Sequence, residues 1–141
     1  MSLSAILHKN SGVIGIGLDL IEVSRIRDLL ERHGERFKAR TFTVDEIAYC
    51  DRCADPAMHY AARFAAKEAA AKALSTGFAD GVSWQDIEIA RAENGAPRLV
   101  LHGGALSLAQ ARGITQMLVS LTHVKEMAAA QVVLGAGPAA G

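Results

Sequence analysis

The sequence contains little that would place the protein in a membrane or outside the cell. No uninterrupted apolar run reaches the roughly 18 residues that cross a bilayer, and the first residues lack the apolar core of a secretion signal. Only two of the 141 residues are cysteines, which is too few for a fold that depends on disulfides. We therefore expect a cytoplasmic protein without a membrane partner.

An excess of charge of one sign is also missing. Fifteen basic side chains balance fifteen acidic ones, so the formal net charge is zero. This balance argues against a general nucleic-acid binder, although it allows a local basic patch. The length predicts one domain, and half of the residues are hydrophobic, which is enough to form a core without metal or disulfide support.

The two cysteines form a single C-x-x-C motif, Cys50 and Cys53. A structural zinc site needs four ligands, and although His59 follows, no second cysteine pair completes the set. A redox motif would follow a strand, whereas residues 45–50 are typical of a helix. We expect two free thiols.

The hydrophobic pattern predicts an α+β domain over residues 13–134, in which an antiparallel sheet packs with helices. Residues 1–12 are expected to form a lead whose start is compatible with an expression scar, and residues 135–141 a flexible tail. The expected strands cover residues 13–21, 84–90, 98–102, 117–122 and 128–134, and the expected helices cover residues 22–34, 43–49, 56–74 and 104–112.

The first strand has two different faces, and we expect it to be buried. Alternation places Ile14, Ile16, Leu18 and Leu20 on one face, and Gly15, Gly17 and Asp19 on the other. The two glycines would let another group approach the backbone closely, while the Asp19 carboxylate reaches that group. Asp19 could instead cap the following helix.

The segment Phe64–Gly77 contains EAAAK, a strong helix former in which Glu68 precedes Lys72 by one turn. Helix propensity alone explains this motif. The many alanines nevertheless suggest that a neighbouring backbone packs closely against the helix. A carboxylate that lies beside lysines on a packed helix is a candidate anion or metal site.

Two further features allow more than one interpretation. Residues 25–40 hold six basic side chains against three acidic ones, which fits either a solvated face or a docking surface for an acidic partner. His123 follows a predicted strand, where a lone histidine is more often structural than catalytic.

Together these features resemble one family. Gly15-Ile-Gly-Leu-Asp19, and Arg63-Phe-Ala-Ala-Lys-Glu-Ala followed by Lys72, look like the two signature motifs of the 4'-phosphopantetheinyl transferases. Trp84–Ile89, Asn94–Pro97 and Ser120–His123 follow in the order and spacing of the small subclass, the holo-acyl-carrier-protein synthases. The resemblance covers residues 13–134.

This resemblance implies an enzyme that uses Mg²⁺ to transfer 4'-phosphopantetheine from coenzyme A to a serine of apo acyl carrier protein, a step in fatty acid biosynthesis that releases adenosine 3',5'-bisphosphate. It further implies a homotrimer with active sites at the subunit interfaces. By position in the motifs, Asp19 and Glu68 are the metal ligands and catalytic residues together with Lys72. The implied coenzyme contacts are Arg63, Lys67, Lys72, Pro97 and His123, and the implied carrier-docking residues are Arg25, Arg32 and Arg36.

The sequence departs from the family at Ala96, where a lysine that could contact the nucleotide end of the coenzyme is usual. The same charged residues would also suit a metal-dependent phosphohydrolase, and the arginine helix alone would suit a non-catalytic subunit that binds carrier proteins. The residues identify no general base: either Glu68 or a metal-bound water or hydroxide could accept the serine proton.

Overall fold

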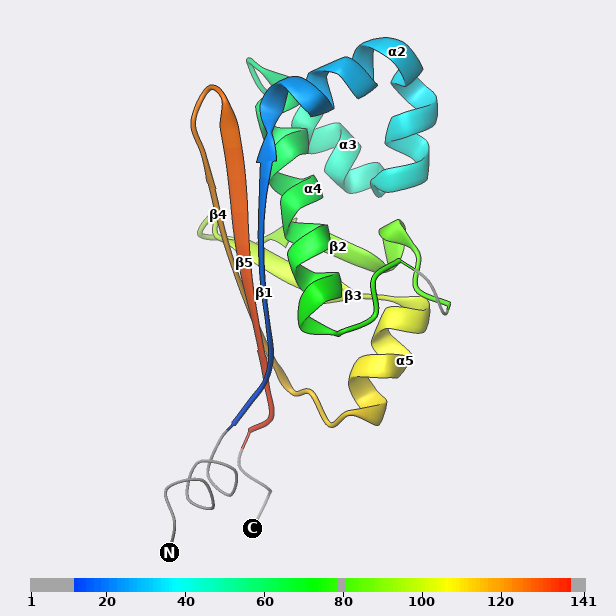
Figure 1. Ribbon diagram of the computed structural model, residues 1–141, viewed down its shortest axis with the longest axis vertical. Coiled ribbons are helices and arrows are strands. Elements are labelled where there is room, and N and C mark those ends of the chain that lie inside the picture. Colours follow the sequence, from blue (N-terminus) through cyan, green and yellow to red (C-terminus); the bar gives the residue numbers. More distant parts are fainter. Residues whose placement is uncertain (1–11, 79–80, 138–141) are drawn as a thin grey trace, which may run out of the picture.

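The computed structural model describes residues 12–78 and 81–137, which form the elements expected of an α+β domain (Figure 1). In chain order they are β1 Val13–Glu22, α2 Val23–Thr41, α3 Val44–Asp51, α4 Pro56–Ala73, the short 3₁₀ turn η1 Trp84–Asp86, β2 Ile87–Arg91, β3 Pro97–Leu101, α5 Gly103–Ala111, β4 Gln116–His123 and β5 Met127–Gly135.

The strands form two antiparallel sheets. The larger sheet has the order β1-β5-β4, so the first and last strands of the chain pair with each other and β1 and β4 form its two edges. The hairpin β2-β3 forms the smaller sheet. Helix α4 lies against β1 and β5 of the larger sheet, while α2 and α3 lie together at one end of the molecule (Figure 1).

The glycines of β1 allow helix α4 to approach the strand closely. A Cβ atom added at Gly17 would lie 2.7 Å from the carbonyl carbon of Ala69, and one added at Gly15 would lie 3.0 Å from that of Ala73. Both distances are far inside normal contact. The predicted close approach is therefore confirmed, but the space beside these glycines holds the backbone of α4 and is not open.

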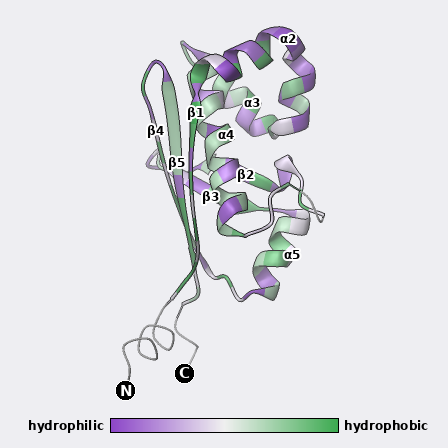
Figure 2. Ribbon diagram, viewed as in Figure 1, coloured by the Kyte–Doolittle hydropathy of each residue, from purple (hydrophilic) through white to green (hydrophobic). Residues whose placement is uncertain are grey.

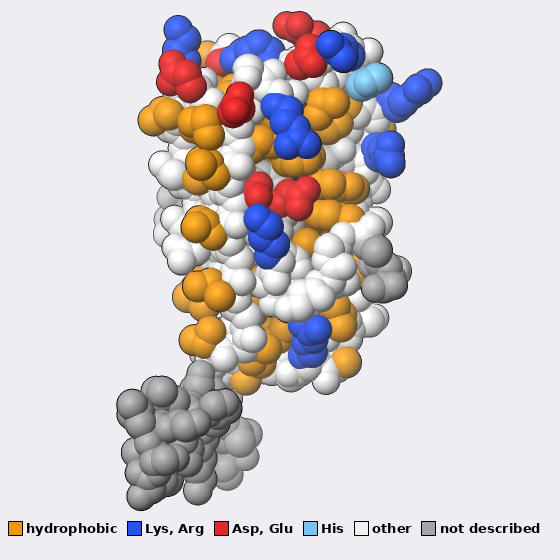
Figure 3. Space-filling model, viewed as in Figure 1, with side chains coloured by type: hydrophobic (Ala, Val, Ile, Leu, Met, Phe, Trp, Pro, Cys, Tyr) orange, Lys and Arg blue, Asp and Glu red, His pale blue; other side chains and the backbone are white. Residues whose placement is uncertain are grey.

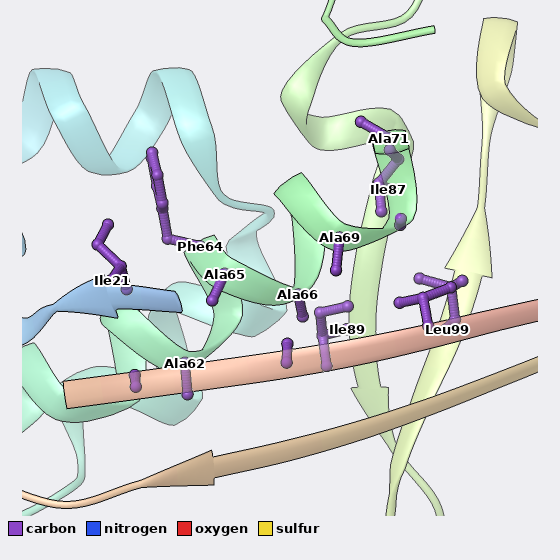
Figure 4. Close-up of a cluster of buried hydrophobic side chains, with 14 of the residues drawn as sticks. Ile21, Ala62, Phe64, Ala65, Ala66, Ala69, Ala71, Ile87, Ile89 and Leu99 are labelled. Atoms are coloured by element: carbon purple, nitrogen blue, oxygen red, sulfur yellow. The ribbon is translucent and has the colours of Figure 1, made fainter. Parts of the chain in front are cut away.

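The alanines of α4 fill the other side of this contact. The side chains of Ala62, Ala65, Ala66 and Ala69 lie in the buried cluster between the helix and the strands (Figure 4). Small side chains let a helix and a sheet approach more closely than leucine or phenylalanine would allow. The alanine-rich sequence thus reflects packing in addition to helix propensity.

The expectation that β1 is a buried strand is wrong for one of its faces. The side chains of Ile16, Leu18 and Leu20 are 62 to 64% exposed, and Leu118 on β4 is 68% exposed. These residues lie on the face of the sheet that α4 does not cover. Figure 2 colours much of β1 as hydrophobic, and Figure 3 shows hydrophobic side chains along the same side of the molecule. Alternation predicts the two faces correctly, but it does not tell which of them this chain covers.

Two element boundaries differ from those expected. The helix expected to end at Gly34 is kinked there, where Gly34 has a φ of 43°. It resumes after the kink and reaches Thr41. Trp84–Asp86 forms a 3₁₀ turn in place of the first residues of a strand. Helix α3 begins with a capping box, in which the side chains of Thr43 and Glu46 each accept a hydrogen bond from the other's backbone amide.

The cysteines are free thiols, as expected. Burial raises the pKa of the Cys50 thiol to about 12. The predicted lead lies almost entirely outside the described residues, and so do residues 138–141 of the predicted tail, whereas Gly135 still belongs to β5. None of the described helices is both long enough and apolar enough to cross a membrane.

Candidate active site

The side chains of Asp19 on β1 and Lys72 on α4 meet where the strand runs past the second half of the helix. The Lys72 ammonium lies 3.0 Å from a carboxylate oxygen of Asp19 and donates a second hydrogen bond of 3.0 Å to the carbonyl oxygen of Leu18. The Lys72 side chain is 54% exposed and that of Asp19 is 18% exposed. The pair therefore lies at the surface, where a substrate can reach it.

Glu68 belongs to the same cluster. Burial raises the pKa of its carboxyl group, the negative charge of Asp19 raises it further, and the positive charges of Lys72 and Arg25 lower it. Two neighbouring carboxylates, of which Glu68 has a raised pKa, form a site that a further cation would stabilise.

The donor set fits Mg²⁺. Asp19 and Glu68 offer oxygen ligands from two different elements, and Mg²⁺ prefers oxygen. No third histidine, cysteine, aspartate or glutamate joins them in the part of the chain that the structure describes. Such a site suits a cation that usually keeps several waters and completes its coordination with phosphate oxygens of the substrate.

Lys67 lies in a different environment from the one expected. Its side chain is completely buried, and its ammonium lies 2.8 Å from a carboxylate oxygen of Glu46 and 3.1 Å from the carbonyl oxygen of Trp84. Burial lowers its pKa, which Glu46 partly opposes. A group with no exposed surface cannot reach a coenzyme phosphate, so the structure does not make Lys67 available as a coenzyme contact.

Three of the expected coenzyme contacts gather in one pocket of about 170 Å³. Arg63 of α4, Pro97 of β3 and His123 of β4 all line it. The ring of His123 lies 5.1 Å from that of His59, which lowers the pKa of His59 in addition to the larger effect of burial. The pocket thus joins a helix, a hairpin and the edge strand β4.

The pocket and the acidic cluster lie at opposite edges of the larger sheet. Asp19 is on β1 and His123 is on β4, with β5 between them. At about 100° per residue, Glu68 points about 140° away from Arg63 around α4, and Lys72 about 180° away. The structure therefore brings together Asp19, Glu68 and Lys72, and separately Arg63, Pro97 and His123, but not the two groups.

The expected docking residues lie on the surface of α2. Arg25 is exposed and close enough to Glu68 to lower the pKa of its carboxyl group. Arg32 forms an exposed ion pair with Asp28, and Arg36 lines a mainly apolar hollow of about 300 Å³ together with Leu29, His33, Phe37 and Arg40. Charged side chains gather at the end of the molecule where α2 lies (Figure 3).

Four residues make contacts that the sequence did not predict. Tyr49, His59 and Arg91 line the pocket of Arg63, and Glu46 pairs with Lys67. His59 precedes Arg63 by four residues on one helix, a spacing that places both on the same face. The positions of Tyr49 and Arg91 depend on contacts between distant parts of the chain, which no local pattern predicts.

Comparison with known proteins identifies the family of this chain. The family model of the 4'-phosphopantetheinyl transferase superfamily matches residues 15–130. The chain belongs to the 4'-phosphopantetheinyl transferase superfamily. Among curated relatives of this transferase, the holo-[acyl-carrier-protein] synthase of Solibacter usitatus is 46% identical over 122 residues, which are 86% of this chain and 98% of the relative. The synthase of Methylobacterium radiotolerans is 48% identical over 130 residues, covering 89% and 96%.

Solved structures agree with this assignment. The transferase superposes on the holo-[acyl-carrier-protein] synthase of Neisseria meningitidis with a TM-score of 0.79 at 33% identity, covering 86% of this chain and 98% of the other. The Bacillus anthracis synthase, solved with coenzyme A (3',5'-ADP), gives 0.75 at 33% identity with coverage of 90% and 100%. Within the superfamily, the transferase is therefore an enzyme of the holo-[acyl-carrier-protein] synthase group.

Proposed function

We propose that this enzyme transfers 4'-phosphopantetheine from coenzyme A to a serine hydroxyl of an apo acyl carrier protein, requires Mg²⁺, and releases adenosine 3',5'-bisphosphate. The observation that carries the proposal is the meeting of Asp19, Glu68 and Lys72 at the surface between β1 and α4. The synthase structures from Bacillus anthracis and Helicobacter pylori, both solved with coenzyme A, support the choice of donor.

Each residue of the cluster has a role in this reaction. Bound Mg²⁺ would neutralise the diphosphate charge that repels an incoming hydroxyl group. Asp19 and Glu68 would hold that cation, and the exposed ammonium of Lys72 would offset the charge that develops on the leaving phosphate. The serine oxygen forms a bond to phosphorus while the bond to the leaving phosphate breaks, and the serine proton passes to Glu68 or to a water molecule.

We further propose that the enzyme works as a homotrimer in which one coenzyme touches two chains. The two groups of site residues lie at opposite edges of one sheet, which makes it difficult for a bound coenzyme to reach both within one chain. The apolar face that includes Leu18, Leu20 and Leu118 is exposed in the single chain, and neighbouring chains would cover it. A ring of three chains then places the pocket of one beside the acidic cluster of the next.

The carrier protein docks on α2 in this proposal. Arg25, Arg32 and Arg36 present positive charge, and the hollow beside Arg36 offers an apolar surface for one side chain of the partner. Charge complementarity of this kind mainly raises the association rate and weakens with salt. The nearness of Arg25 to Glu68 would bring the docked serine close to the metal. Arg25→Glu should therefore raise the KM for the carrier much more than the KM for coenzyme A.

Release of adenosine 3',5'-bisphosphate, followed by chromatography, tests the reaction itself. We expect release only when apo carrier protein and Mg²⁺ are both present, with none from a carrier whose acceptor serine is alanine. Release at the same rate without a carrier would show a phosphohydrolase and contradict the proposal. Stable carrier binding without any release would show a docking subunit.

Mixing two inactive variants tests the shared site. Glu68→Ala and Arg63→Gln should each be inactive as pure trimers. When equal amounts are unfolded and refolded together, about a quarter of the sites combine an intact Glu68 from one chain with an intact Arg63 from its neighbour. Activity should recover to about that fraction. Recovery no greater than the sum of the two pure variants would contradict a site shared between chains.

A further inference from the structure

Helix α2 consists of two arms that meet at Gly34, and the helix changes direction there (Figure 1). Residues 23–33 form the first arm and residues 35–41 the second. Gly34 has a φ of 43° and a ψ of −119°, and a Cβ atom added to it would meet none of the described residues within 4 Å. The glycine therefore serves the backbone conformation and not a close contact. Because glycine leaves such a junction flexible, contacts outside the helix are needed to fix the angle between the arms.

Both arms build the apolar hollow beside Arg36, which has a volume of about 300 Å³. The first arm contributes Leu29 and His33, and the second contributes Arg36, Phe37 and Arg40. The shape of the hollow therefore depends on the angle at the kink. A movement of the second arm would reshape the hollow and displace Arg36 at the same time.

The first arm is anchored to the rest of the domain by its own contacts. The guanidinium of Arg27 donates two hydrogen bonds of 3.0 Å to the two carboxylate oxygens of Asp55, just before α4. The Val23 amide donates a bond of 2.9 Å to the carbonyl oxygen of Glu126, in the turn between β4 and β5. These contacts fix the first arm independently of the second.

The second arm ends at carbonyl groups that receive their donor from a distant side chain. In a continuing helix the Thr43 amide would donate to the carbonyl oxygen of Ala39, but it donates to Glu46 at 2.8 Å in the capping box of α3. The side-chain nitrogen of Gln85 donates instead to the carbonyl oxygens of Ala39 and Phe42, the latter at 3.2 Å. A side-chain amide has two N–H donors, so Gln85 can serve both carbonyl groups at once.

The turn that carries Gln85 is itself held from the interior. Gln85 is the middle residue of η1, and the buried ammonium of Lys67 donates hydrogen bonds to carbonyl oxygens at both of its ends. These acceptors are Trp84, at 3.1 Å, and Ile87, at 2.5 Å. Gln85 therefore reaches the second arm from a fixed base.

We propose that Gln85 is a positioning residue for the carrier protein, because it fixes the second arm of α2 behind the kink at Gly34 and so preforms the hollow and the place of Arg36. This inference rests on the proposed function, in which the carrier docks on α2. A preformed surface binds more tightly than one that must be ordered during binding. Gln85 is uncharged and belongs to neither group of site residues, so its effect should be confined to the carrier.

Steady-state kinetics of Gln85→Met test the proposal. Methionine has a similar length but lacks both N–H donors. The ion pair between Lys38 of the second arm and Asp51 of α3 remains, so the arm should move without unfolding. We expect the KM for the carrier to rise by about threefold to tenfold, while kcat and the KM for coenzyme A stay within about twofold. Gln110→Met, the same change on the exposed surface of α5, should alter none of the three.

Double variants separate positioning from a general loss of stability. Arg36 lies on the second arm, so a displaced arm no longer presents it to the carrier. Gln85→Met and Arg36→Gln together should therefore raise the carrier KM by less than the product of their single effects. Gln85→Met and Arg25→Gln should multiply, because Arg25 lies on the separately anchored first arm. The same combination rule for both pairs would overturn the positioning role.

Amide hydrogen exchange of the free enzyme needs neither carrier nor coenzyme. Gln85→Met should speed exchange in residues 38–42 more than in residues 26–32. Faster exchange there with an unchanged carrier KM would make Gln85 a structural contact only and overturn the inference, as would equal rises in the KM for the carrier and for coenzyme A. A wild-type enzyme that modifies no carrier would overturn the proposed function and the docking role of Gln85 with it, whereas exchange would still report whether Gln85 holds the second arm.

Discussion

Replacing Lys67 with methionine separates the structural role of this lysine from a role in coenzyme binding. Methionine has a similar length, so the change removes the charge and the hydrogen bonds while it keeps most of the volume. Both side chains of the Lys67–Glu46 pair are buried, with exposed fractions of 0 and 1%. The variant therefore leaves a carboxylate in the interior without its cation.

The size of the effect follows from what remains around Glu46. Its carboxylate still accepts bonds of 2.8 Å from the Thr43 amide and 2.9 Å from the Ile89 amide, which compensate part of its charge. The carbonyl oxygens of Trp84 and Ile87 lose a donor. Removing one partner of a buried pair costs about 3 to 5 kcal/mol, so we expect a loss of roughly 3 kcal/mol in the free energy of unfolding.

Urea denaturation followed by circular dichroism measures this loss. With a slope of about 1.5 kcal/mol per molar urea, the midpoint should fall by roughly 2 M. The double variant Lys67→Met with Glu46→Gln should recover at least about 1 kcal/mol, because it no longer buries an unpaired charge. Calorimetry at low temperature, where both proteins are folded, should show unchanged affinity for adenosine 3',5'-bisphosphate. An unchanged midpoint with weakened nucleotide binding would refute this reasoning and return Lys67 to the coenzyme site.

Three further changes test the packing, the apolar face and the thiols. Gly17→Ala places a methyl group against the backbone of α4 and should lower the free energy of unfolding by about 3 kcal/mol or more. Gly137→Ala, whose added methyl group meets only ordinary contacts, should lower it little. Equal urea midpoints for the two variants would contradict the close packing. In light scattering, wild type should have about three times the chain mass of 14.9 kDa, whereas Leu118→Glu should have a mass near that of one chain. A wild-type protein with the mass of a single chain would contradict the trimer. At pH 8, N-ethylmaleimide should modify Cys53 before the buried Cys50, whose pKa of about 12 keeps it protonated, and equal rates in the folded protein would show that Cys50 is accessible.

The sequence predicted the parts of the site that depend on local spacing. Glu68 and Lys72 lie one turn apart on a helix, and the alternation of β1 places Asp19 on the same face as its glycines, so both patterns indicate where these side chains point. The resemblance to a family then indicated that the two elements meet. The structure shows the Asp19–Lys72 contact directly.

The sequence did not predict features that depend on contacts between distant segments. The capping box of α3 accounts for one carboxylate oxygen of Glu46, but the other oxygen binds the Ile89 amide, which lies far along the chain. No local sequence pattern therefore indicated that Glu46 is the partner of Lys67. The apolar side chains of β1 indicated a covered face, but alternation does not tell whether this chain or a neighbouring chain covers it.

Intact-mass spectrometry of an apo acyl carrier protein tests the central claim most directly. After incubation with the enzyme, coenzyme A and Mg²⁺, the account predicts a carrier that is heavier by one phosphopantetheine group. It also predicts that the added mass disappears when a chelator is present or when Glu68→Gln, which keeps the size of the side chain and removes its charge, replaces the wild type. A carrier that gains the same mass at the same rate with Glu68→Gln would contradict the assignment of the active site.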